Sequence, residues 1–404
     1  MNNTPRSERV HIAIFGRRNA GKSSLINAIT NQDLSIVSST PGTTTDPVYK
    51  SMEILPLGPV VLIDTAGIDD EGELGKLRVE KTIEVINRAD IALIVIGDNL
   101  NEYNYEKQLI EYLNKKNIPI IGVLNKIDIL SNYINLLASL TKELGIKIHP
   151  VSCYTKKGIE ELKNLIAKTI PDVNEDLRIV GDLINPGDFV VLVVPIDKAA
   201  PKGRLILPQQ QTIRDILDSD SIAIVTKEYE LRETIGSLGK KPSIVITDSQ
   251  AFLKVDADTP PDIRLTSFSI LFARYKGDLL SFVEGVKKLK DLKDGDTVLI
   301  SEACTHHRQC DDIGTVKIPR WVKQIAGYNI NFEWSSGISY PKDLSKYSLI
   351  VHCGGCMITR REMLYRINLA KESNIPITNF GMLIAYLHGI LPRALKPFGI
   401  DFEY

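Results

Sequence analysis

The chain has 404 residues, of which 49 are basic, 50 are acidic and 43% are hydrophobic. This length predicts two or three domains, and the ordinary composition excludes a largely disordered, collagenous or coiled-coil protein. The balanced charge gives no global positive field, so we expect no nucleic-acid partner. The longest apolar run, 189–196, is too short to cross a membrane, and the first residues lack the apolar core of a signal peptide. We therefore expect a cytoplasmic protein with no membrane contact.

Short apolar runs alternate with amphipathic stretches from residue 10 to residue 170. The runs are typical of buried parallel strands and lie at 11–16, 60–67, 91–96 and 119–128. The amphipathic stretches have helical spacing and lie at 22–31, 78–89, 105–116 and 159–170. This alternation predicts an α/β domain with a doubly wound parallel sheet. We place it at 1–171, followed by a linker at 172–187, because Pro171 ends the last helix.

Two further α/β modules follow. The first, at 188–265, has predicted strands at 189–196, 221–227 and 243–247 and a helix at 211–217. The second, at 266–404, has predicted strands at 297–301 and 348–352 and helices at 278–292, 359–373 and 380–389. The apolar run 189–196 is compatible with an edge strand that pairs across a two-fold axis and equally with a central buried strand.

The segment from Gly16 to Ser23 has the spacing G-x-x-x-x-G-K-S directly after a predicted strand and before a predicted helix. Glycines let backbone N–H groups close around phosphate, and the helix N-terminus adds its positive dipole end. Lys22 is expected to reach the β- and γ-phosphates, and the Ser23 hydroxyl is expected to bind Mg²⁺. The predicted phosphate loop comprises Gly16, Asn19, Ala20, Gly21, Lys22, Ser23 and Ser24.

Four more motifs follow in an order that predicts a GTPase. Asp64-Thr-Ala-Gly67 ends a strand, where the carboxylate can hold the Mg²⁺ shell and the Gly67 N–H can contact the γ-phosphate. The loop 41–46, PGTTTD, supplies a threonine to Mg²⁺, for which we favour Thr44. In Asn125-Lys126-Ile-Asp128 the carboxylate can accept both hydrogen bonds that guanine, but not adenine, offers together. Backbone contact to the base is expected at Ser152 and Cys153.

The motif order and the PGTTTD loop resemble the Era/TrmE branch of translation-factor-like GTPases over residues 9–170. Ile68 stands where other GTPases carry a water-positioning glutamine, which predicts slow hydrolysis. The resemblance implies that Asn19 helps to hold a K⁺ ion against the phosphates, in partial replacement of an arginine finger. The alternative is that Asn19 only caps or hydrogen-bonds the loop. The catalytic group is then expected to comprise Asn19, Lys22, Thr44, Asp64 and Gly67.

Four of the five cysteines lie between residues 304 and 356. Cys304-Thr-His306 and His352-Cys353-Gly-Gly-Cys356 each follow a predicted strand, so both halves can meet at one edge of a sheet. Thr359 and Glu362 have capping-box spacing at the start of the next helix, whose expected buried face carries Met363, Leu364, Ile367 and Ala370.

This constellation leaves the metal open. Three thiolates suit an iron–sulfur cluster with one iron not bound by cysteine, whereas three cysteines and a histidine also suit structural zinc. A redox dithiol of Cys353 and Cys356 is a third possibility. His306 and His352 are assigned to hydrogen bonding around the sulfurs or to a labile fourth position. Cys310 is interpreted as a bystander.

Together, the GTPase motifs and the C-x-H…H-C-x-x-C pattern resemble the HydF family, the GTPases among the maturation proteins of [FeFe]-hydrogenase. Segments 194–197 (VPID) and 200–204 (APKGR) belong to the resemblance, which covers essentially the whole chain. It implies a GTPase domain, a dimerisation domain and a domain that holds a [4Fe–4S] cluster on Cys304, Cys353 and Cys356. The fourth ligand stays open among Asp197, His352 and water.

The resemblance further implies a homodimeric scaffold that carries the two-iron subcluster of the hydrogenase. Its implied partners are two radical-SAM maturases and the apo-hydrogenase, and its implied cofactors are GTP, Mg²⁺, K⁺ and the [4Fe–4S] cluster. The alternative hypothesis is a regulatory GTPase with a structural zinc domain that acts on RNA or the ribosome. The neutral charge and the lack of a basic tail favour the first hypothesis.

Overall fold

A computed structural model describes residues 4–31, 47–65, 81–97, 102–170, 177–195, 205–303, 312–327, 329–337 and 339–404. The chain divides into two compact units, Met1–Asp172 and Val173–Tyr404. No helix among these described residues is long and apolar enough to cross a membrane. Short helical turns lie at Arg6–Glu8, Gly181–Leu183, Ser249–Ala251, Lys288–Asp291, Ile313–Lys317 and Lys396–Phe398.

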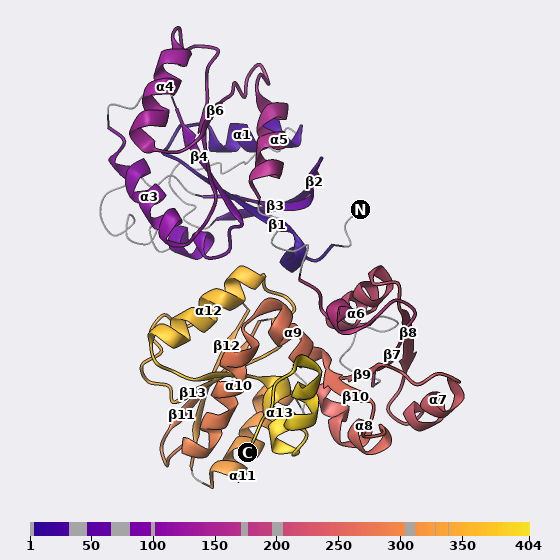
Figure 1. Ribbon diagram of the computed structural model, residues 1–404. Helices are drawn as coiled ribbons and strands as arrows, with labels where there is room; N and C mark the ends of the chain where they lie inside the picture. Colours follow the sequence, from indigo (N-terminus) through magenta and orange to yellow (C-terminus); the bar gives the residue numbers. More distant parts are fainter. Residues whose placement is uncertain are drawn as a thin grey trace. The chain divides into compact units, whose positions relative to one another are not determined.

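The first unit contains a six-stranded sheet in the order β2-β3-β1-β4-β5-β6 (Figure 1). Only β2 runs antiparallel to its neighbour, at one edge. The strands are β1 (Val10–Phe15), β2 (Val48–Ile54), β3 (Gly58–Asp64), β4 (Ile91–Ile96), β5 (Ile120–Leu124) and β6 (Ile148–Pro150). The described helices are α1 (Lys22–Thr30), α3 (Asn104–Lys115), α4 (Tyr133–Leu144) and α5 (Ile159–Thr169), with a further helical segment at 81–86.

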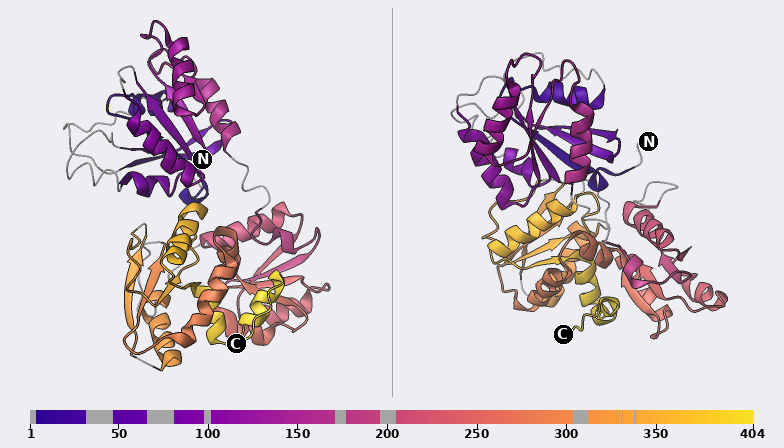
Figure 2. Two further views of the ribbon diagram at one scale, coloured as in Figure 1. Left: turned by 60° about the vertical axis from the view of Figure 1, so that its left-hand side comes forward. Right: turned by 45° about the horizontal axis from the view of Figure 1, so that its top comes forward.

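Helices cover both faces of this sheet (Figure 2). On one face, alternate strand residues such as Ile12 and Leu62 pack against Leu25 of α1 and Leu162 of α5. On the other face, their neighbours in the strands pack against 81–86, α3 and α4. Strands that bury both faces must be apolar at nearly every position, which is why the continuous apolar runs predicted them. The predicted doubly wound α/β fold is confirmed.

The second unit contains two four-stranded parallel sheets, in the orders β10-β9-β7-β8 and β12-β11-β13-β14. The strands of the first are β7 (Phe189–Val193), β8 (Ile222–Thr226), β9 (Ile244–Thr247) and β10 (Arg264–Ser267). Those of the second are β11 (Thr297–Glu302), β12 (Asn331–Ser336), β13 (Leu349–His352) and β14 (Ile377–Asn379). One continuous apolar cluster takes residues from both sheets, including Val191, Val245, Leu299 and Ile350.

Short helices connect and cover these strands. They are α6 (Leu207–Asp218), α7 (Leu231–Ser237), α8 (Phe252–Asp258), α9 (Phe268–Lys276), α10 (Leu279–Lys287), α11 (Ile318–Ala326), α12 (Arg360–Glu372), α13 (Phe380–Leu387) and α14 (Leu391–Leu395). Strand β7 pairs with β8 on one side and β9 on the other. The option that the run at 189–196 forms an edge strand is therefore wrong, because both of its backbone edges are already hydrogen-bonded within the sheet.

Candidate functional site

The phosphate loop connects the buried strand β1 to helix α1. Lys22 is 9% exposed, and its ammonium donates to the carbonyl oxygens of Gly16 (2.7 Å) and Arg17 (2.9 Å). Gly21 has a φ of 95°, and a Cβ atom there would stand 2.2 Å from the Asn125 side-chain nitrogen. Only glycine has the conformational freedom and the space for this position. The loop and the Asn125 segment are thus in direct contact.

Ser23 and Asp64 form a pair of oxygen donors at the start of α1. The Ser23 hydroxyl donates to Oδ2 of Asp64 at 3.1 Å. Burial raises the pKa of the Asp64 carboxyl. Its Oδ1 atom is buried and has no hydrogen-bond partner among the described residues. A small hard cation such as Mg²⁺ prefers oxygen ligands and would pair this carboxylate oxygen, so the residues present fit the ion.

The predicted base-binding residues come together at the carboxyl ends of β5 and β6. The Asn125 amide donates to the Ala20 carbonyl (3.2 Å) and accepts from the Cys153 N–H (3.3 Å). The Ser152 hydroxyl donates to Oδ1 of Asp128 at 2.6 Å. Burial raises the pKa of the Cys153 thiol to about 12, so this cysteine stays neutral. One carboxylate oxygen of Asp128 is thus held by Ser152.

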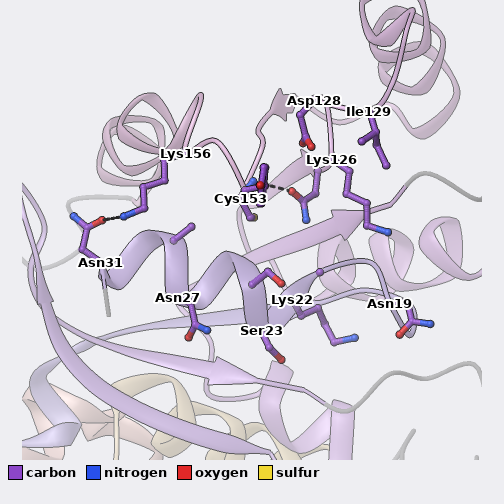
Figure 3. A pocket seen from close by; sticks show the side chains of 15 residues that line it. Asn19, Lys22, Ser23, Asn27, Asn31, Lys126, Asp128, Ile129, Cys153 and Lys156 are labelled. Carbon is purple, nitrogen blue, oxygen red and sulfur yellow. Dashed lines mark hydrogen bonds between the residues drawn. The ribbon is translucent and has the colours of Figure 1, made fainter. Parts of the chain in front are cut away.

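These residues share a cavity of about 850 Å³ (Figure 3), within the usual range for small-molecule and cofactor sites. In the figure, Lys156 points toward Asn31, to which it donates a hydrogen bond at 3.2 Å. The predicted residues lining the cavity are Asn19, Gly21, Lys22, Ser23, Ser24, Asn125, Lys126, Asp128 and Cys153. The lining residues that the sequence analysis missed are Asn27, Ala28, Asn31, Ile129, Tyr154 and Lys156.

A charged pair that the sequence analysis also missed lies beside the phosphate loop. Arg17 binds the carboxylate of Glu106 through Nε and a terminal nitrogen, each at 3.0 Å. Glu106 lies on α3 and is completely buried. The two residues are 89 positions apart, so no local sequence signal indicates their contact.

The second candidate site is the loop 352–356, His-Cys-Gly-Gly-Cys, which follows β13. The Cys353 sulfur accepts hydrogen bonds from the N–H groups of Ala303 (3.0 Å) and Gly355 (3.4 Å). Burial raises the pKa of the Cys353 thiol to about 11. Gly355 has a φ of 65°, the left-handed conformation that lets the chain turn between the two cysteines. Two N–H donors aimed at one sulfur suit a metal-bound thiolate.

His352 is completely buried beneath this loop. Its Nδ1 lies 2.7 Å from the Cys353 carbonyl oxygen, and its Nε2 lies 3.1 Å from a terminal nitrogen of Arg366. Burial and the Arg366 charge lower the pKa of His352 to about 3, so the imidazole is neutral. On the other side of the loop, the buried Lys276 donates to the carbonyls of Cys356 (3.1 Å) and Ile358 (2.9 Å).

Several predicted site residues lie outside the described part of the chain. They are Thr44, Gly67, Asp197, Cys304, His306 and Cys310. Within the described residues, no group of three or more His, Cys, Asp or Glu side chains could hold a metal ion. The capping prediction at 359–362 holds for Thr359, whose hydroxyl accepts from the Glu362 N–H at 3.2 Å. The Glu362 carboxylate itself binds Arg366 at 3.0 Å.

Three family models match successive segments of the chain. A model of the hydrogen maturase F dimerization domain matches residues 179–277, and one of the hydrogen maturase F tetramerization domain matches residues 280–397. A model of the 50S ribosome-binding GTPases matches residues 11–126. The two maturase matches together cover more than half of the chain. The chain belongs to the hydrogen maturase F (HydF) family. The resemblance noted in the sequence is thereby confirmed.

Individual relatives match this HydF chain over part of its length. GTPase Der of Kosmotoga olearia is 32% identical over 249 residues, which are 56% of this chain and 55% of Der. The tRNA modification GTPase MnmE of Thermoanaerobacter sp. strain X514 is 41% identical over 161 residues, 39% of this chain and 34% of MnmE. The chain thus spans between about a third and just over half of the length of these curated relatives.

Two solved structures match parts of the chain. Aquifex aeolicus Era bound to GDP·AlF4⁻ is 22% identical, covers 54% of this chain and 94% of Era, and has a TM-score of 0.36. The G domain of T. maritima FeoB is 26% identical, covers 40% of this chain and 99% of that domain, and has a TM-score of 0.32.

The family matches thus bring together in one chain a GTPase domain and the hydrogen maturase F dimerization and tetramerization domains. The alternative hypothesis is a regulatory GTPase with a structural zinc domain that acts on RNA or the ribosome. The match at 11–126 is to 50S ribosome-binding GTPases, whereas the maturase matches at 179–277 and 280–397 give this alternative no support.

We predict that Asp128→Asn abolishes the preference for guanine. The substitution replaces two charge-assisted hydrogen bonds to the base, so the Kd for GDP should rise about 100-fold or more while that for ADP stays unchanged. Competition binding with a fluorescent nucleotide measures both constants. Ser152→Ala is the matched control, because it keeps the carboxylate and removes the hydroxyl, which donates to Asp128 at 2.6 Å and accepts from the Thr155 N–H at 3.1 Å; we expect a rise of about tenfold or less. An unchanged GDP preference in Asp128→Asn would contradict the base assignment.

Proposed function

We propose that this HydF protein is a cytoplasmic GTP-hydrolysing scaffold that holds a [4Fe–4S] cluster on Cys304, Cys353 and Cys356. It receives a two-iron subcluster precursor made with two radical-SAM maturases and delivers it to apo-[FeFe]-hydrogenase. One observation carries the cluster assignment. Ala303, the residue before Cys304 in the chain, donates its N–H to the Cys353 sulfur at 3.0 Å. This contact follows from the pairing of β11 with β13, in which Ser301 stands beside His352.

The chemistry of the loop supports a metal-bound thiolate there. Desolvation keeps the Cys353 thiol neutral near pH 7, with its pKa at about 11, so a thiolate at this partly buried position requires a positive partner. A bound iron–sulfur cluster supplies that partner, and the N–H groups of Ala303 and Gly355 then stabilise the charge on sulfur. A cluster with three cysteine ligands keeps one exchangeable iron position, which a carrier requires.

Cys353→Ala should remove the cluster and leave GTP turnover unchanged. After anaerobic reconstitution, we expect about four irons per chain in the unsubstituted protein and a reduced [4Fe–4S] EPR signal, both lost in the variant. Cys153→Ala is the matched control, since that cysteine lines the nucleotide cavity, and it should retain the iron. Stoichiometric zinc with no reconstitutable iron would contradict the cluster and favour a structural zinc site.

In the nucleotide unit, we propose that Lys22 binds the β- and γ-phosphates, Ser23 and Asp64 hold Mg²⁺ together with Thr44, and Gly67 contacts the γ-phosphate. The backbone at Ser152 and Cys153 contacts the base.

Asn19 lines the cavity with a φ of 61°, a conformation that asparagine tolerates better than most residues. We propose that its side chain helps to hold K⁺, whose charge stabilises the transition state in place of an arginine finger. Hydrolysis is slow because no glutamine follows Gly67.

K⁺ should accelerate GTP hydrolysis relative to Na⁺, and Asn19→Ala should reduce the ratio of the two turnover rates to about 1. Steady-state phosphate release in matched KCl and NaCl buffers measures this ratio. Asn27→Ala provides the control, because Asn27 lines the same cavity and should keep the K⁺ preference. If Asn19→Ala slows both rates equally, Asn19 only supports the loop and the K⁺ proposal is wrong.

For the homodimer, we propose that two copies meet along the edge strand β8. This strand lies within the segment matched by the dimerization-domain model, at the end of its sheet. It exposes two aliphatic side chains, Ile222 at 45% and Val225 at 48%. An exposed apolar edge strand is a surface that pairs with another chain unless it is protected.

Val225→Lys should convert the dimer to a monomer, because a charge on the edge blocks strand pairing. Sedimentation velocity measures the mass directly. Leu253→Lys is the control, since Leu253 is 57% exposed on α8 of the same segment but lies away from the strand edge. A dimer that persists in Val225→Lys at the same concentration would place the interface elsewhere.

A further inference from the structure

A fully buried arginine lies beneath the cysteine loop. Arg366 is on α12 and is 0% exposed. Its Nε donates to Glu362 at 3.0 Å, one terminal nitrogen to the Gly337 carbonyl at 2.9 Å, and the other to the Ser301 hydroxyl at 3.4 Å. The Tyr340 ring covers the guanidinium, with 4.9 Å between Cζ and the ring centroid. All three nitrogens of the guanidinium therefore have a hydrogen-bond partner, which restrains its orientation.

Arg366 determines which ring nitrogen of His352 carries the proton. The terminal nitrogen that reaches Ser301 also lies 3.1 Å from His352 Nε2. A guanidinium has donors only, so Nε2 must carry the lone pair and accept. The ring proton then sits on Nδ1 and is donated to the Cys353 carbonyl oxygen at 2.7 Å. Both ring nitrogens are committed to protein groups, and the hydrogen bonds fix the tautomer.

Four further hydrogen bonds hold the same loop and the residues just after it. The Cys353 sulfur accepts from Ala303, and the Cys353 N–H donates to the Ser301 carbonyl at 2.9 Å. Lys276 holds the carbonyls of Cys356 and Ile358. The backbone on either side of the Cys353 sulfur is thus fixed before any metal binds. A histidine that moved to bind iron would leave a guanidinium N–H and the Cys353 carbonyl unpaired in the protein interior, which is unfavourable.

We propose that His352 is a positioning residue for the cluster loop and not one of its metal ligands, and that Arg366 holds it in that role. This inference rests on the proposed cluster function. It leaves the exchangeable iron position to Asp197, His306 or a solvent molecule. It also gives Arg366 a part in metal retention, since residues that orient metal ligands typically change metal affinity 10–100-fold when they are substituted.

Two substitutions of His352 separate positioning from ligation. His352→Gln can still accept from Arg366 and donate to the Cys353 carbonyl, whereas His352→Leu can do neither. We expect His352→Gln to keep the iron content and the EPR spectrum of the reduced cluster. His352→Leu and Arg366→Met should lose iron to a chelator about 10–100-fold faster than the unsubstituted protein does. Arg366→Lys should lose iron at an intermediate rate. Fluorescence of Trp321 and Trp334, which lie in the same unit, reports whether each variant is folded.

Pulsed EPR of the full-length protein provides the decisive readout. A strong ¹⁴N coupling in the unsubstituted protein that disappears in His352→Gln would show that His352 binds iron, and would overturn the inference while the cluster proposal stands. If the unsubstituted chain takes up zinc instead of iron, the cluster proposal fails, and the zinc content of His352→Gln then tests the role of His352. Zinc retained by His352→Gln supports positioning, and zinc lost by that variant overturns it. A chain that takes up neither metal overturns both proposals.

Discussion

Where parallel strands are buried on both faces, polar functional side chains lie at the ends of the strands. The chain follows this constraint in both units. In the first, the phosphate loop follows β1, Asp64 ends β3, and Asn125 and Ser152 follow β5 and β6 at the same edge of the sheet. In the second, the cysteine loop follows β13, directly beside the end of β11. Because β11 and β13 are parallel neighbours, residues about 50 positions apart meet at one edge, and the Ala303 N–H reaches the Cys353 sulfur. The sheets thus place the functional groups, and the loops only orient them.

Charges buried at these edges fix the loops, because a buried charge must be paired. Arg17 on the phosphate loop binds the buried Glu106 of α3 with two hydrogen bonds, which ties the loop to a helix on one face of the sheet. Arg366 and Glu362 form a similar pair below the cysteine loop. Neither pair is strong support for stability, since desolvation offsets much of the attraction between buried ions. Their effect is geometric, because each pair ties a loop or the residues beneath it to a neighbouring element.

Much of this organisation could be predicted from the sequence, and the failures have physical causes. Motifs with fixed local spacing, such as the segment from Gly16 to Ser23, specify a local backbone shape and therefore located the nucleotide cavity. Helical periodicity at 359–373 correctly predicted that Met363, Ile367 and Ala370 are buried, yet Leu364 is only partly buried and Arg366 is completely buried. Periodicity indicates which face of a helix is apolar, but not which residues a side chain contacts. Arg366 contacts His352 and Ser301, which lie on two other elements. The sequence likewise left open whether β7 pairs on one edge or on both, because an apolar run is typical of a central strand and of an edge strand alike.

Two lysines, Lys22 and Lys276, hold the loops by the same kind of hydrogen bond, but they differ in whether their ammonium groups can change partners. Lys22 donates to the Gly16 and Arg17 carbonyls of its own loop, and Lys276 donates to the carbonyls of Cys356 and Ile358. Lys22 lines the cavity, so a phosphate bound there can replace these carbonyls as the partner of its ammonium. Lys276 is 2% exposed and has its carbonyl partners within the protein interior. Its ammonium cannot exchange partners without leaving a buried charge unsatisfied. We therefore expect the phosphate loop to change its hydrogen bonds with each nucleotide cycle, and the cysteine loop to keep its hydrogen bonds whether or not metal is bound.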